Sequence, residues 1–163
     1  MDLHKAARDP WVWGQLGLFI LVLLAAPLLP RLINLGSLDY ALNRVDPLWI
    51  RALGAVVMAA GILVVGWGAR SLGANLTPGT EPLATGELVV SGAYAHTRHP
   101  IYAGVILLLT GYTLAWSNWT LALLGGGLAV VFFRAKARKE EEWLNSRFPA
   151  YQTYRRHVPR MLL

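Results

Sequence analysis

Four apolar stretches, each close to the length of a membrane-spanning helix, constrain the fold of this sequence more than any other feature. They cover residues 11–29, 48–66, 101–116 and 119–133. A helix needs about 20 apolar residues to cross the hydrocarbon core of a bilayer, and the first two stretches meet this length. The last two are shorter and are separated only by residues 117 and 118, which predicts a tight helical hairpin. We therefore expect an all-α integral membrane protein with about four transmembrane helices in a single domain, residues 1–163.

Composition agrees with a membrane protein. The chain has 163 residues, of which 55% are hydrophobic and only 15% charged, whereas about 25% of residues are charged in a typical soluble domain. No small-residue cleavage site follows the first apolar stretch, so we expect it to be a span and not a signal peptide. The absence of cysteine excludes disulfides and thiolate metal sites. The four histidines are too scattered to suggest a zinc site. Tryptophans lie near the ends of the stretches, as in an aromatic belt: Trp11, Trp13, Trp49, Trp67, Trp116 and Trp119.

The distribution of basic residues predicts the orientation. With four spans, one side of the membrane carries the N-terminus, the 66–100 loop and the C-terminal segment. This side holds twelve of the fifteen Lys and Arg residues, so the positive-inside rule places it in the cytoplasm. A net charge of +6 is also compatible with nucleic-acid binding. The basic residues adjoin the spans, however, so we expect contact with membrane lipids and none with nucleic acid. The expected location is a bacterial inner membrane.

Small residues predict how the helices pack. Gly54 and Gly61 are one heptad apart in the second stretch, and Gly125, Gly126 and Gly127 lie in the fourth. Glycine lets helix backbones approach closely in lipid. The same glycines would also leave room for a ligand, but close packing is the favoured interpretation.

The first predicted cytoplasmic segment, residues 71–104, is rich in glycine and proline, so most of it is expected to form a structured loop. Pro100 suits the first turn of the third helix. Arg98 and His99 would then lie at the helix N-terminus, where backbone N–H groups can also bind an anion. Taken alone, such a short motif more often only marks the membrane interface.

The second segment, residues 134–160, is expected to continue the fourth helix into the cytoplasm. Tyr151 and Tyr154 are three residues apart and are expected to pack together on a second short helix. Taken alone, the segment is typical of a solvated helix with basic residues near lipid head groups. Oppositely charged residues spaced by four share a helix face: Lys136 with Glu140, and Arg138 with Glu142.

Together the two segments resemble the isoprenylcysteine carboxyl methyltransferases and phospholipid N-methyltransferases, integral membrane enzymes that use S-adenosylmethionine. The resemblance covers about residues 70–160. Pro149 stands where the family usually has glycine, and Glu142 leaves the register of the acidic pair open, although the distance to Phe148 favours Glu140 and Glu141. The matching elements, in order, are Leu88-Val89, Gly92-Ala93-Tyr94, Arg98 to Gly104, Glu140-Glu141, Phe148-Pro149, Tyr151, Tyr154 and Val158-Pro159.

The resemblance implies a cofactor site built from both segments. S-adenosylmethionine carries both signs of charge and an adenine, so its site needs both signs of charge and an apolar wall. The resemblance implies catalytic roles for Arg98, His99 and Glu140. Lys136, where prenylcysteine-type members carry an arginine, and Arg134 would face the substrate. The implied cofactor-binding residues are Glu87, Leu88, Val89, Tyr94, His99, Pro100, Ile101, Tyr102, Glu140 and Glu141.

The expected function is S-adenosylmethionine-dependent methyl transfer to a small lipophilic acceptor that enters from the bilayer. Transfer from a sulfonium needs mainly alignment and exclusion of water. A carboxylate or an amine acceptor is compatible with the sequence, and the oligomeric state is left open. Two alternatives are an NADPH-dependent reductase of the steroid-reductase type and a non-catalytic membrane protein that retains the fold. The Arg-His-Pro motif with a later Glu-Glu pair favours the methyltransferase.

Overall fold

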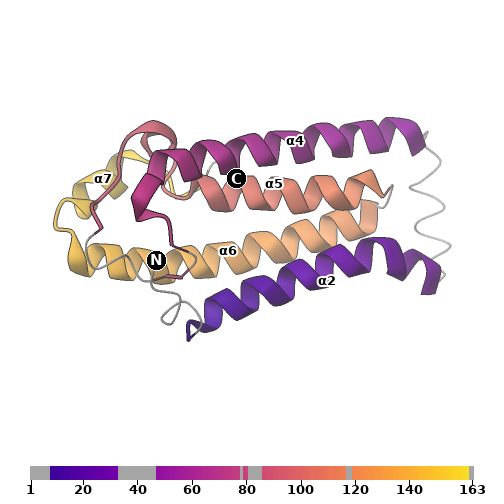
Figure 1. Ribbon diagram of the computed structural model, residues 1–163, viewed down its shortest axis with the longest axis horizontal. Coiled ribbons are helices and arrows are strands. Elements are labelled where there is room, and N and C mark those ends of the chain that lie inside the picture. The colour runs from indigo at the N-terminus through magenta and orange to yellow at the C-terminus, as the bar shows by residue number, and fades with distance from the viewer. Residues whose placement is uncertain (1–7, 33–46, 78, 81–85, 117–118, 162–163) are drawn as a thin grey trace.

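The computed structural model describes residues 8–32, 47–77, 79–80, 86–116 and 119–161. Four long helices lie side by side along the longest axis of the molecule, and a short helix caps one end of the bundle (Figure 1). The helices are α2 (Pro10–Leu32), α4 (Pro47–Leu72), α5 (Pro100–Ala115), α6 (Trp119–Arg147) and α7 (Tyr151–His157), with short 3-10 turns η1 (Gly73–Asn75) and η2 (Gly92–Ala95).

The predicted all-α membrane architecture is confirmed. Three helices are long and apolar enough to cross a membrane, namely α2, α4 and α6, while α5 is a shorter apolar helix. The prediction that α6 continues beyond residue 133 is also confirmed, because the helix ends at Arg147. Its extension consists mostly of Lys, Arg, Glu and Ala, which favour the helix.

Two helix ends differ from the predictions. Helix α2 continues past residue 29 through Pro30 to Leu32. Helix α4 extends to Leu72, so the loop starts later than residue 66. Gly73 follows with φ of 55°, a left-handed conformation that commonly ends a helix at a glycine. The hairpin turn predicted at 117–118 lies outside the described residues.

Glycines hold α4 and α5 in close contact, which confirms the packing role predicted for Gly54 and Gly61. A Cβ atom on Gly61 would lie 2.6 Å from the backbone nitrogen of Leu108 and 2.7 Å from the carbonyl oxygen of Gly104. Gly54 meets the carbonyl of Gly111 in the same way, at 2.7 Å. Any side chain at these positions would force the two backbones apart.

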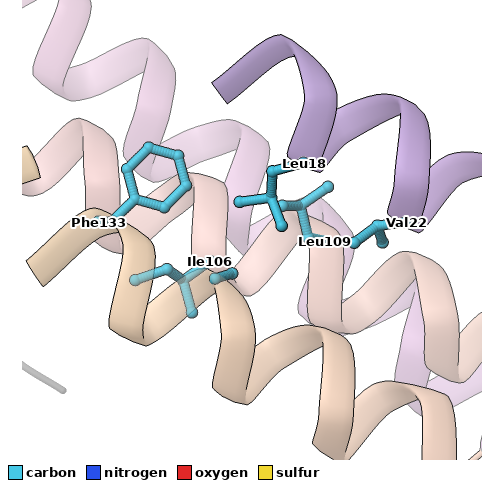
Figure 2. Packing of buried hydrophobic residues seen from close by; sticks show 6 residues of the cluster. Leu18, Val22, Ile106, Leu109 and Phe133 are labelled. Atoms are coloured by element: carbon cyan, nitrogen blue, oxygen red, sulfur yellow. The ribbon is translucent and has the colours of Figure 1, made fainter. Parts of the chain in front are cut away.

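Side chains from three helices form the main buried cluster (Figure 2). On the outside of the bundle, in contrast, large apolar side chains are exposed, such as Leu63 at 73% and Leu123 at 71%. A soluble monomer rarely exposes apolar surface on this scale, whereas a bilayer would cover it. The cluster comprises Leu18 and Val22 of α2, Ile106 and Leu109 of α5, and Ala129 and Phe133 of α6.

One end of the bundle gathers the two segments singled out from the sequence. Helix α4 ends there, α2 and α5 begin there, and the polar extension of α6 leads from it to α7 (Figure 1). The chain after α7 returns to the start of α5. The backbone N–H of Arg98 donates to the carbonyl of Pro159 at 2.9 Å, and that of His99 to the carbonyl of Arg160 at 3.2 Å. The C-terminal segment thus closes this end of the molecule.

Candidate active site

The Arg-His-Pro motif forms the corner at which the chain enters α5. Pro100 is the first helical residue, as predicted, and His99 caps the helix. The backbone N–H groups of Arg98 and His99 donate to the returning C-terminal segment. These two backbone groups are therefore already engaged and do not bind an anion at this corner.

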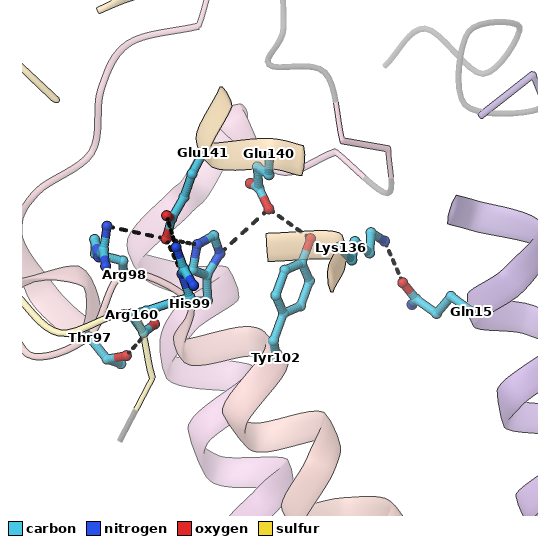
Figure 3. Close-up of polar contacts among 9 residues, drawn as sticks. All are labelled: Gln15, Thr97, Arg98, His99, Tyr102, Lys136, Glu140, Glu141 and Arg160. Carbon is cyan, nitrogen blue, oxygen red and sulfur yellow. Dashed lines mark hydrogen bonds and ion pairs between the residues drawn. The ribbon is translucent and has the colours of Figure 1, made fainter. Parts of the chain in front are cut away.

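Glu141 connects α6 to the corner and to the C-terminal segment (Figure 3). The guanidinium of Arg160 donates to both of its carboxylate oxygens, at 2.9 and 2.7 Å. Arg98 lies 3.2 Å from the same carboxylate. The Glu141 side chain is only 7% exposed, so these charge-assisted contacts are largely shielded from water. Glu141 is saturated by partners within the protein. Sequence reasoning missed Arg160, because its role depends on the chain folding back to the corner.

The His99 ring lies between the two acidic side chains. Its Nε2 is 3.1 Å from Glu141 and its Nδ1 is 3.5 Å from Glu140. The ring stacks on Tyr102 with centroids 5.2 Å apart. Burial disfavours the charged imidazolium, but the hydrogen bonds and charges of the two carboxylates outweigh it and raise the pKa of His99. Both ring nitrogens thus face carboxylates, which favours a protonated ring.

Glu140 differs from its neighbour in its exposure. The Tyr102 hydroxyl donates to its carboxylate at 2.8 Å, and its side chain is 28% exposed against 7% for Glu141. Glu140 lines an open cleft, whereas Glu141 does not. Glu142 does not contact the corner, and its carboxylate pairs with the ammonium of Lys139 at 2.9 Å. Glu140 and Glu141 are thus the two glutamates that meet the corner.

The cleft lies between the end of α4, the 86–94 segment, α6 and α7. One wall is apolar and aromatic, and Glu140, Glu87 and Arg98 contribute charges of both signs. Six of its residues were predicted from the sequence: Glu87, Leu88, Val89, Tyr94, Arg98 and Glu140. Sequence reasoning did not assign the other eight to the site: Leu72, Asn75, Thr77, Gly86, Leu144, Phe148, Tyr151 and Tyr154.

Hydrogen bonds from both sides fix the 86–94 wall of the cleft. The backbone N–H of Glu87 donates to the Asn75 side chain at 3.0 Å. The Tyr154 hydroxyl donates to the carbonyl of Tyr94 at 2.6 Å. The predicted contact of Tyr151 with Tyr154 is confirmed, with ring centroids 5.9 Å apart. Burial raises the pKa of Tyr154 to about 12, so its hydroxyl remains a donor at neutral pH.

Two buried donors in the cleft lack partners. The Nε of Arg98 and the hydroxyl of Tyr151 make no hydrogen bond within 3.5 Å with any residue that the structure describes, although the Arg98 guanidinium lies near enough to the Tyr151 oxygen to interact with it. Burial raises the pKa of Tyr151, so this hydroxyl is protonated at neutral pH. Buried polar groups are nearly always satisfied in native structures. The two donors are therefore suited to an anionic group of a ligand.

Seven predicted site residues do not line this cleft. Three of them, His99, Tyr102 and Glu141, make the contacts described above. The other four are Pro100, Ile101, Lys136 and Arg134. Pro100 and Ile101 pack against Gly68 of α4. Lys136 is buried, and its ammonium donates to the side chain of Gln15 at 2.6 Å and lies 5.5 Å from the centre of the Tyr102 ring. Arg134 is exposed on α6. The cofactor and substrate contacts predicted for these four residues remain predictions.

Asp9, which sequence reasoning also missed, connects the start of α2 to the loop near the cleft. Its carboxylate accepts from the backbone N–H of Trp11 at 2.9 Å, as an N-cap does. It also accepts from the backbone N–H and the hydroxyl of Thr80, at 2.7 and 2.9 Å. Within the described residues, no group of three or more His, Asp or Glu side chains is arranged to hold a metal ion.

Comparison with known proteins adds two findings. Residues 49–150 match the sequence model of the phospholipid methyltransferase family. The chain is also 30% identical over 73 residues to the nickel-cobalt-cadmium resistance protein NccN of Alcaligenes xylosoxydans xylosoxydans, in a match that covers 45% of this chain and 34% of that protein. The chain thus spans about a third of the length of this curated relative. The family match covers more than half of the chain and includes the corner, the acidic pair and most of the cleft. This chain belongs to the phospholipid methyltransferase family.

Proposed function

We propose that this protein transfers a methyl group from S-adenosylmethionine to a small lipophilic acceptor at the membrane surface. The observation that carries the proposal is the composition of the cleft. A partly exposed carboxylate, two unsatisfied buried donors and an apolar wall occur together at one end of a membrane-spanning bundle. Family membership supports the methyltransferase over the reductase alternative.

The charges of the cleft fit the methionine end of the cofactor. Glu140 would accept from the α-ammonium, because its carboxylate faces the cleft and is held by only one strong hydrogen bond, from Tyr102. Arg98 and Tyr151 would donate to the α-carboxylate, which would satisfy both unpaired donors. The apolar side chains of Leu88, Val89, Leu144 and Phe148 would pack against the adenine.

His99 and Glu141 would not contact the cofactor and would act as positioning residues for the side chains that do. His99 is buried and directs both ring nitrogens to carboxylates, so it would orient Glu140 without itself lining the cleft. Glu141 holds His99, Arg98 and the C-terminal segment in one arrangement. His99 is thus poorly placed to be a general base, because neither nitrogen is directed to the cleft.

The bound cofactor would supply an electrophilic methyl group, so the protein has mainly to align it with the acceptor and exclude water. A carboxylate acceptor would need no base, whereas an amine would have to lose a proton. The acceptor would enter from the bilayer, near Lys136 and Arg134. We further propose that the termini and the cleft are cytoplasmic in a bacterial inner membrane, where soluble cofactor reaches the cleft directly.

Calorimetric titration of the detergent-purified protein with S-adenosylmethionine tests this proposal, with NADPH titrated in parallel. We expect micromolar binding of S-adenosylmethionine and none of NADPH. Glu140→Ala should weaken binding at least tenfold, since it removes the cleft carboxylate that Tyr102 holds in place. His99→Ala should also weaken binding, by releasing Glu140 from its position.

Glu142→Ala is the matched control, because Glu142 is exposed, only two residues from Glu140 in the sequence and outside the cleft. It should bind the cofactor as the unmodified protein does. Binding of NADPH in place of S-adenosylmethionine would favour a reductase. Absence of binding to either cofactor would favour a non-catalytic protein. Either result would overturn the proposal.

A further inference from the structure

Gln15 is an exception in the sequence of α2. It is the only residue with an amide, hydroxyl or charged side chain between residues 11 and 29. A polar side chain in an apolar span is costly in lipid and normally faces the interior of the helix bundle. Gln15 is half-buried, and its amide oxygen accepts a hydrogen bond of 2.6 Å from the ammonium of Lys136 on α6 (Figure 3). Gln15 therefore connects α2 to the helix that carries the acidic pair.

Glu140 is a competing partner for Lys136 on the same helix. It follows Lys136 by four residues, a spacing that places both side chains on one face of α6 with Cβ atoms about 5–6 Å apart. The two groups are near enough to interact electrostatically. Within the residues that the structure describes, however, Glu140 contacts Tyr102 and His99 and forms no ion pair with Lys136. The spacing permits an ion pair, but the two side chains bond to different neighbours.

The Lys136 ammonium is directed away from Glu140 and toward α2 (Figure 3). It lies 5.5 Å from the centre of the Tyr102 ring, while the hydroxyl of that ring donates to Glu140. Lys136 is only 1% exposed, and opposite charges attract each other more strongly in such surroundings than in water. Of the two carboxylates that act on this ammonium, Glu140 acts more strongly than Asp9. Without Gln15, we therefore expect Lys136 to pair with Glu140.

We propose that Gln15 is a positioning residue that draws Lys136 away from Glu140 and so keeps the Glu140 carboxylate available to the cofactor. This inference rests on the proposed role of Glu140 in binding the α-ammonium of S-adenosylmethionine. The ammonium of Lys136 and that of the cofactor would otherwise compete for one carboxylate. By offering Lys136 a neutral amide, α2 leaves Glu140 to the cleft. Gln15 lies outside residues 49–150, so the family match does not include this contact.

Other contacts hold α2 against its neighbours, so a change at Gln15 tests its hydrogen bond and not the packing of the helices. The rings of Trp11 and Phe132 have centroids 5.7 Å apart. Gly14 approaches Phe132 so closely that a Cβ atom would lie 2.9 Å from the ring. Leu18, one turn beyond Gln15, belongs to the main buried cluster. Gln15→Leu nearly conserves the size of the side chain, and the variant should therefore retain the fold.

Calorimetric titration of the detergent-purified full chain with S-adenosylmethionine tests the proposal. Gln15→Leu should weaken binding by roughly tenfold, because a site that is competent about a tenth of the time binds about tenfold more weakly. The double variant Gln15→Leu/Lys136→Met should restore binding, since it lacks the competing ammonium. Gln15→Glu should bind as the unmodified protein does, because it retains an acceptor oxygen for Lys136. Undiminished binding in Gln15→Leu, or a loss that the double variant does not reverse, would overturn the proposal.

Zero-length carbodiimide crosslinking, followed by mass spectrometry of the digested protein, tests the same contact without the cofactor. The reagent forms an amide, with loss of water, only where an amine touches a carboxylate. Lys136 and Glu140 should be joined in Gln15→Leu and not in the unmodified protein. The exposed pair of Lys139 and Glu142, whose charged groups are 2.9 Å apart, is the internal control and should be joined in both proteins.

A crosslink between Lys136 and Glu140 in the unmodified protein, or its absence from Gln15→Leu when the control pair is joined, would overturn the proposal. If the unmodified protein does not bind S-adenosylmethionine, the proposed function fails. The crosslinks would then still decide whether Gln15 keeps Lys136 from Glu140.

Discussion

A methyl group added at Gly61 should destabilise the bundle by an amount that follows from the α4–α5 contact. The new Cβ would lie 2.6 Å from the backbone nitrogen of Leu108, whereas ordinary contacts begin at 3.4 Å. The backbones would have to separate by about 0.8 Å, a gap that forfeits roughly a quarter to a half of each dispersion contact across it. Because the obstructing atoms belong to the backbone, no rotamer change relieves them. We expect a cost of about 2 kcal/mol, within the range for overpacked cores.

Thermal unfolding in detergent micelles would measure this effect. A loss of about 2 kcal/mol should lower the melting temperature of Gly61→Ala by roughly 4–8 °C in a chain of this size. The control is Gly66→Ala on the same helix, where a Cβ would meet nothing within 4 Å. Alanine should be neutral or slightly stabilising there, because it favours the helix more than glycine. An unchanged melting temperature for Gly61→Ala would refute the close α4–α5 contact.

Three further predictions concern the site. Glu141→Gln should cost about 3 kcal/mol, because it leaves its cationic partners uncompensated, whereas the exposed Glu142→Gln should leave the melting temperature unchanged; equal effects would contradict the buried network. The raised pKa of His99 means that its contribution to stability is complete below its unfolded pKa of about 6.5 and declines as pH rises through the folded value. The melting temperature should therefore fall as the pH rises above about 6.5, and it should fall less steeply in His99→Gln. Equal slopes of melting temperature against pH in the two proteins would count against a charged ring. Tyr154→Phe should cost about 1 kcal/mol through its lost hydrogen bond, whereas Tyr151→Phe should leave stability nearly unchanged and weaken cofactor binding; the reverse pattern would exchange their assigned roles.

The helices were predictable because their signals are local. Runs of apolar residues identified all four long helices, and Pro100 marked the start of α5 to within a residue. The α4 end was missed because Ala69 and Arg70 favour the helix although they follow the apolar run. The sequence signal for a membrane span ends before the helix does.

The site was predictable only where residues formed contiguous motifs. The corner and the acidic pair were found, but the different environments of Glu140 and Glu141 were not, because adjacent residues on a helix point in directions about 100° apart. Arg160 and Asp9 were missed for another reason. Each contributes through a contact with residues distant in sequence, and no local pattern distinguishes such a residue from an ordinary surface charge.

Transfer of a radiolabelled methyl group from S-adenosylmethionine into the lipid fraction tests the central claim most directly. The assay would use purified protein in vesicles made from total bacterial lipid extract, with Glu140→Gln as the comparison. We predict label in the organic phase with the unmodified protein, and at least a tenfold loss in Glu140→Gln under conditions where thermal unfolding shows that the variant is folded. Undiminished transfer in Glu140→Gln, or no transfer by the unmodified protein, would contradict the proposed methyl transfer.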